Sequence, residues 1–204
     1  MALTQTVTAY SNNETPKTAI ATNYTRALTP LGSTPSTIST VTATEYSTGK
    51  DVVTVLTLTD FVVGALAGAG AALGMGNIIY TFPAGQHFEL VYGLSNISLT
   101  AAGTAVNTDT GLGSVIASGA VSVLSGTGTF EDRLTGQTIA TASGGGTAVS
   151  KLLAATAGIG TGISLNATSS VKDVFLNSAG TWNANNVGSL IANGQVVLKW
   201  TIMN

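Results

Sequence analysis

The sequence predicts an all-β protein: an antiparallel β-sandwich of the jelly-roll kind with an extended N-terminal arm. Three observations predict it. From residue 38 onward, short runs rich in Val, Leu, Ile and Thr follow one another. Turn-forming residues separate these runs roughly every ten residues, which is typical of sandwiches. No long amphipathic helix pattern is visible along the chain.

The first 36 residues are predicted to form the arm, and residues 37–204 the sandwich domain. Residues 3–10 alternate apolar residues with Thr, as a strand does. The remainder of the arm holds three of the four prolines, Pro16, Pro30 and Pro35. Proline fixes φ and lacks an N–H, so this stretch is expected to be extended and poorly self-paired. It either lies along a neighbour in an assembly or is a loop with one edge strand.

The sandwich is assigned strands in chain order. They are expected at 38–46, 51–63, 77–83, 87–99, 113–126 (one or two short strands broken at Gly119), 137–141, 172–177 and 194–203. Alternation should place Phe88, Leu90, Tyr92 and Leu94 on one face of their strand. It should likewise place Val196, Leu198, Trp200 and Ile202 on one face of the last strand. Only residues 146–158 and part of 64–74 invite a helix.

An uncharged block at 61–80 is long enough to cross a bilayer. However, it contains five glycines, and each costs about 1 kcal/mol in a helix interior. No basic residue or Trp flanks it to set a topology. We therefore expect two strands joined by a connection across 64–76, and no membrane span. The spacing Gly68, Gly70, Gly74 lacks the following helix and acidic residue of a dinucleotide site.

The charge content is low, at 8% of residues against about 25% in typical soluble proteins. The seven basic residues are scattered, which excludes the clustered cations of a nucleic-acid or anionic-lipid site. A surface of small neutral polar groups provides little repulsion between copies. It predicts a chain held in an assembly; the alternative is a secreted monomer with a Thr-rich β surface. The absence of Cys and of a signal-like N-terminus fits synthesis in the cytoplasm.

Catalytic chemistry finds little support. His87 is the single histidine, and no G-x-S-x-G elbow accompanies it. Asp109, Glu131 and Asp132 are the plausible oxygen donors of the middle region, but no ligand spacing links them. We predict no enzyme, no metal and no cofactor. A hydrolase using His87 and Glu131 is the weakest of the alternatives.

Trp182 lies in a polar loop with Asn183 and Asn185. An exposed Trp there could stack on a sugar, and a buried one would close the core as a lid. These three residues, with Tyr92, form the candidate site of a recognition module. A separate set is assigned to assembly contacts as a hypothesis: Leu3, Val7, Tyr10, Ile20, Tyr24, Leu28, Phe61, Val62, Val63 and Leu66.

Five motifs, in this order, resemble a known family. They are F-P-A-G at 82–85, D-T-G-L-G-S at 109–114, T-F-E-D at 129–132, F-L-N…W at 175–182 and G-x-V-x-L-x-W at 194–200. The chain over residues 78–202 thereby resembles small virion structural proteins of tailed phages and prophages, encoded near the head genes. The arm lies outside the resemblance.

The resemblance implies a head decoration or cement protein. The expected partner is the major capsid protein, and the expected location is the outer surface of the virion head. Cement proteins stabilise a shell through many modest contacts. A homotrimer is expected because threefold positions recur in such lattices. The alternative is a tail-fibre, spike or sugar-binding module.

Overall fold

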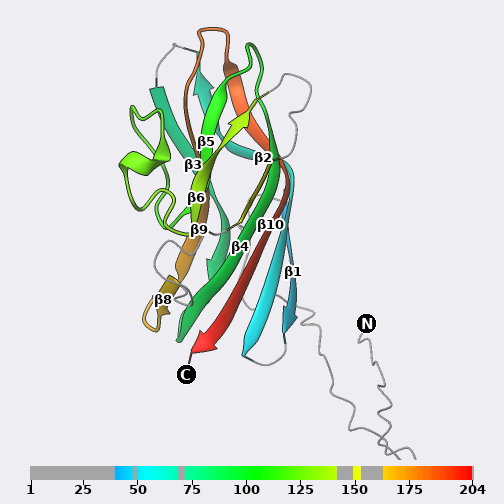
Figure 1. The fold of residues 1–204 in the computed structure, drawn as a ribbon, viewed down its shortest axis with the longest axis vertical. Helices are drawn as coiled ribbons and strands as arrows, with labels where there is room; N and C mark the ends of the chain where they lie inside the picture. Colours follow the sequence, from blue (N-terminus) through cyan, green and yellow to red (C-terminus); the bar gives the residue numbers. More distant parts are fainter. Residues whose placement is uncertain (1–39, 48–49, 69–71, 142–148, 153–162, 204) are drawn as a thin grey trace, which may run out of the picture.

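The computed structural model describes residues 40–47, 50–68, 72–141, 149–152 and 163–203. Two antiparallel sheets pack face to face, which confirms the predicted β-sandwich (Figure 1). The arm, residues 1–36, lies outside the described residues. The strands are β1 (Val41–Ser47), β2 (Asp51–Ala67), β3 (Ala72–Phe82), β4 (Gln86–Thr100), β5 (Asn107–Gly113), β6 (Leu134–Ala140), β7 (Val149–Leu152), β8 (Ile163–Ala167), β9 (Lys172–Thr181) and β10 (Val187–Met203).

The strand order is that of a jelly roll. One sheet runs β1-β2-β10-β4, with β7 and β8 both paired to β4, and the other runs β3-β9-β5-β6. Early strands pair with late ones: β2 with β10, β3 with β9, β4 with β7 and β8, and β5 with β6. This is one long antiparallel hairpin folded over on itself to give two sheets. The chain changes sheet at each step from β2 to β5.

The core between the sheets contains aromatic side chains at one end. Phe82, Phe88 and Trp200 form a cluster with ring centroids 4.9–5.3 Å apart. Tyr80 packs edge-on against Phe82 at 5.0 Å. Its hydroxyl donates a hydrogen bond to the buried carboxylate of Glu45. The prediction for the last strand is confirmed, because Val196, Leu198 and Trp200 are fully buried and Ile202 packs against this core.

The uncharged block forms parts of β2 and β3 rather than a long connection. Strands at both ends were predicted, but β2 continues to Ala67 and β3 begins at Ala72. The glycines allow these strands to approach closely: a Cβ on Gly64 would lie 2.7 Å from Cβ of Met75. No helix in the described part of the chain is long and apolar enough to cross a membrane.

A β-bulge in β4 makes the predicted face of that strand wrong for its second half. Lys199 of β10 pairs with Tyr92 and Trp200 pairs with Leu90, so Val91 is the extra residue. Phe88 and Leu90 point into the core as expected. Tyr92 and Leu94 lie beyond the bulge and point outward, because one inserted residue inverts the alternation.

Two other local expectations are wrong. Residues 114–126 form no strand; they make an irregular loop with a short 3-10 helix, η1 (Leu124–Gly126). Val149–Leu152, where a helix was expected, is strand β7, and it pairs with Leu94–Ile97 of β4. Pairing along β4 outweighs the weak helical spacing of this short apolar run. The rest of the expected helix lies outside the described residues.

Candidate functional site

A long loop between β5 and β6, residues 114–133, packs on the four-stranded sheet. We call it the excursion; Figure 1 shows it as green loops beside the strands. It has a small apolar core of its own, in which Ala117, Leu124 and Phe130 pack with Ala179 of β9. Ordered loops of this length are uncommon in compact domains and are usually functional.

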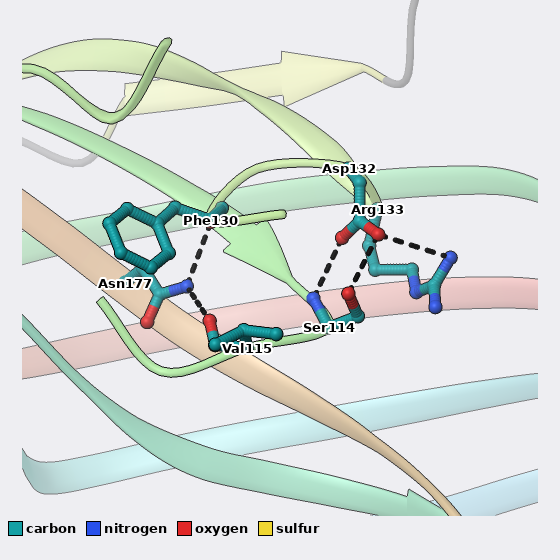
Figure 2. Close-up of polar contacts among 6 residues, drawn as sticks. All are labelled: Ser114, Val115, Phe130, Asp132, Arg133 and Asn177. Carbon is teal, nitrogen blue, oxygen red and sulfur yellow. Dashed lines mark hydrogen bonds and ion pairs between the residues drawn. The ribbon is translucent and has the colours of Figure 1, made fainter. Parts of the chain in front are cut away.

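The carboxamide of Asn177 holds the excursion onto β9. Its Nδ2 donates to the carbonyl oxygens of Val115 and Phe130, each at 2.8 Å (Figure 2). Its Oδ1 accepts from the backbone N–H of Ala117 at 2.9 Å. The side chain is fully buried, so these bonds replace the water that the polar groups would otherwise need. One residue thus joins both ends of the loop to the sheet.

Both strand neighbours of Asn177 are glycines, and one of them, Gly76, makes room for the amide. Gly76 of β3 and Gly111 of β5 both pair with Asn177. A Cβ on Gly76 would overlap Oδ1 of Asn177. The sequence alone does not reveal this arrangement, because the three residues are far apart in the chain and come together only in the sheet.

Asp132 closes the base of the excursion. Its carboxylate accepts from the N–H of Ser114 at 2.7 Å and from the Ser114 hydroxyl at 2.8 Å (Figure 2). Arg133 Nη1 lies 3.6 Å from Oδ2 of Asp132, the same oxygen that accepts from the Ser114 hydroxyl. Burial lowers the pKa of Arg133 below its ordinary value, while the charge of Asp132 acts in the opposite direction. The pair therefore fixes the loop rather than offering an exposed ionic site.

The other two candidate oxygen donors also bind backbone groups. Asp109 accepts from the N–H of Leu124 at 2.7 Å, and Glu131 accepts from the N–H of Gly136. The two carboxylates lie on either side of Gly136, where a Cβ would contact both. Among the described residues, no three His, Cys, Asp or Glu side chains are grouped to hold a metal ion.

The excursion exposes apolar side chains at its surface. Val115, Ile116 and Val123 are 44%, 45% and 50% exposed. Their backbone is fixed from below by Asn177, Asp132 and the small core, so they are presented in one arrangement. Rigidly held apolar groups on a loop are typical of a protein-binding surface.

A second apolar surface covers the six-stranded sheet on the side away from the core. We call it the outer face and define it by two rows of paired residues. One row is Thr44, Val55, Val197 and Leu94; the other is Tyr46, Val53, Lys199 and Tyr92. The aliphatic members are half-buried although they point away from the core.

The assembly contacts predicted within β2 are divided between core and surface. Phe61, Val63 and Leu66 belong to the core between the sheets. Val62 points away from it and is 41% exposed. Only Val62 of these four can touch a neighbour without the sandwich opening. Leu3, Val7, Tyr10, Ile20, Tyr24 and Leu28 lie outside the described residues.

Trp182 closes the core as a lid. It is 2% exposed, and its indole N–H donates to the carbonyl of Leu73 at 3.4 Å. Asn183 and Asn185 are exposed beside it. The loop is fixed by Asn186, which sequence analysis did not single out: its Nδ2 donates to the carbonyls of Ala102 and Thr104 at 2.7 and 2.8 Å. A sugar site here would have no aromatic platform from Trp182.

His87 lies on the surface at the start of β4. Its Nε2 is 2.7 Å from the hydroxyl of Ser164 on β8. Both residues point away from the core on a sheet surface, since Phe88 and Leu165 between them are buried. Glu131, the carboxylate considered with His87 for catalysis, accepts from the N–H of Gly136 on the other sheet. The structure therefore does not bring His87 and Glu131 together.

Comparison of the chain with protein-family models, curated proteins and solved structures gave no match. The function must therefore be argued from the two surfaces described above.

Proposed function

We propose that the protein is a non-enzymatic structural component of a virion, which decorates the head of a tailed phage by binding the major capsid protein. The observation that carries the proposal is the excursion, which presents Val115, Ile116 and Val123 on a backbone fixed by Asn177. It takes the assembly-contact role that the sequence assigned to four residues of β2, because three of them, Phe61, Val63 and Leu66, are needed in the core.

The physical properties of the excursion suit binding to a large fixed partner. A preorganised loop loses little conformational freedom on binding, so modest contacts suffice. A shell offers many equivalent sites, and copies bound to several subunits gain from multivalency. Low charge removes electrostatic repulsion between crowded copies. The motif resemblance over residues 78–202 supports the same role.

The fold alone does not choose between roles. Jelly rolls occur in viral capsid proteins, in lectins and in enzymes. The proposal therefore rests on the surface of the excursion and not on the sandwich that carries it. We further propose that the copies form trimers at the threefold positions of the shell, where each copy meets an equivalent environment.

The test is co-sedimentation of the purified protein with mature, expanded phage heads from which it has been stripped. We expect saturable binding at a fixed ratio to the shell subunit. A triple variant, V115S/I116S/V123S, should lose at least about tenfold in affinity because it removes the exposed apolar area. Val171→Ser is the matched control, since Val171 is also 50% exposed but lies between β8 and β9.

Three outcomes would contradict the proposal. The wild-type chain fails to bind heads and is found in tail or secreted fractions; the triple variant binds as well as wild type; or Val171→Ser weakens binding equally. Circular dichroism and thermal unfolding of the variants show that any loss is not a folding defect, because all four positions are exposed.

A further inference from the structure

The two sheets differ in what covers their faces away from the core. On the four-stranded sheet the excursion covers part of that face, with Leu124 and Phe130 packed on Ala179. On the six-stranded sheet no described element lies over the outer face. All described strands belong to the two sheets, and η1 lies against β5, β6 and β9.

The outer face is nevertheless apolar at its centre. Val55, Val197 and Leu94 lie side by side on β2, β10 and β4 (Figure 1 shows these strands adjacent). Lys199 is the one charged side chain in the two central rows. In an antiparallel sheet with one solvated face, the side chains on that face are normally polar. The apolar composition of the outer face is therefore typical of a surface that another segment or molecule covers.

The chain before β1 is long enough to supply a covering segment. Residues 1–39 enter the fold at β1, which is the edge strand of this same sheet. Each extended residue reaches up to about 3.3 Å, so this length exceeds the width of the sheet several times over. Within it, Leu3, Gln5, Val7 and Ala9 alternate with three threonines and Tyr10, which predicts a segment with one mostly apolar side.

The sequence just before β1 favours a neighbouring sheet over the chain's own. To lie on its own outer face, the arm would have to reverse direction close to the edge of β1. Pro30 and Pro35 instead favour extended backbone in this segment, both at the prolines and at the residues before them. This preference favours an arm directed away from its own sheet and toward that of a second copy.

We infer that the outer face is the docking site for the arm of a second copy, with residues 3–10 lying over Val55, Val197 and Leu94. The inference rests on the proposed function in one respect, since it requires copies to lie side by side. Around a threefold axis each copy would give one arm and receive one, so that every outer face is covered.

The chain has no cysteine, so engineered pairs report contacts without background. Val7→Cys and Val197→Cys are made in separate chains, mixed and oxidised mildly. A disulfide needs Cα atoms within about 7 Å, so it forms only where the arm reaches the face. We expect a covalent dimer on a non-reducing gel, and mass spectrometry should show positions 7 and 197 joined across two chains. Leu94→Cys offers a second position if Val197→Cys folds poorly.

The control partner is Thr138→Cys, an exposed position on β6 of the other sheet. The inference is overturned if Val7→Cys joins this position as readily, or joins neither. A double variant, V7C/V197C, tests whether the arm lies on the sheet of its own chain. It is diluted before oxidation so that a disulfide within one chain is favoured over one between chains. If it closes within one chain while the mixture gives no dimer, the occupant is the same molecule and the inference is wrong.

Head binding is measured separately and through different residues. If the copies cross-link but do not bind heads, the proposed function is wrong and the arm exchange is still supported. Head binding without cross-linking would do the reverse, because the excursion and the outer face lie on opposite sheets.

Discussion

Asn177 on β9 and Phe130 in the excursion are 47 residues apart in sequence, yet the side-chain amide of the first donates to the backbone carbonyl of the second at 2.8 Å. The same amide also binds Val115 and Ala117, so one buried side chain holds the loop to the sheet at three points. The position of the exposed apolar side chains that we assign to binding therefore depends on a buried residue that no partner would touch.

Asn177→Ala should lower the free energy of unfolding by about 3 kcal/mol, because it leaves two carbonyls and one N–H buried without partners. The amide of Ala117 should also exchange with solvent faster. Chemical denaturation and hydrogen exchange measure the two effects. Asn185→Ala, at an exposed position, is the control and should change stability by less than about 0.5 kcal/mol. Unchanged protection at Ala117 would show that the loop is held by other contacts.

Asp60 is the one non-glycine residue with positive φ in the described chain, at 50°. It lies at a register shift where its N–H donates to Oδ1 of Asn193 at 2.8 Å, and Asn193 Nδ2 donates back at 3.2 Å. Asp60→Gly and Asp60→Ala lose the same carboxylate, but only Gly relieves the left-handed backbone. The Gly variant should be more stable by about 1 kcal/mol. Equal midpoints in urea would mean that the backbone conformation is not strained.

Gly194 of β10 pairs with Ile97 of β4 at close range, and its φ is 134°. An added Cβ would overlap the carbonyl oxygen of Asn96 and lie 2.9 Å from Cα of Ile97. Since both are backbone atoms, Gly194→Ala should cost about 3 kcal/mol. Gly126→Ala, where nothing lies within 4 Å, is the control and should be close to neutral. Comparable thermal midpoints for the two variants would contradict the close approach of the two backbones at Gly194.

The only two tryptophans are both buried, Trp182 at 2% and Trp200 at 0% exposure. Acrylamide should quench their fluorescence weakly in the native state and strongly after unfolding. Adding glycans should leave the emission unchanged, because no indole face is available for stacking. A glycan that shifts or quenches the emission would favour a recognition module and direct attention to the loop around Asn183.

The sequence predicts the parts of the fold that depend on simple alternation. In the last strand every second residue from Val196 to Trp200 enters the core, as its polarity indicates. A hydrophobic pattern of period two determines which side of a strand is buried, and hence the class of fold. The glycine-rich block was also correctly assigned to β structure at both ends.

The candidate site could not be predicted in the same way. The excursion contains valines spaced like those of a strand, but its backbone groups bind Asn177, Asp132 and Asp109 instead of a neighbouring strand. Such partners are chosen by tertiary contact, which alternation does not encode. Trp182 shows the same limit: a polar loop sequence surrounds it, yet the ring is inside.

The bulge at Val91 has a consequence for how this protein can change. It divides β4 into two segments of opposite parity, one supplying the interior and the other the outer face. Deleting this single residue would turn Leu94 and Tyr92 inward and bring Ser95 and Gly93 to the surface. Most substitutions along β4 alter one surface or the other. An insertion or deletion at this position would exchange the residues of the interior with those of the outer face. The evolution of the outer face is therefore constrained by the number of residues in β4 more than by their identities.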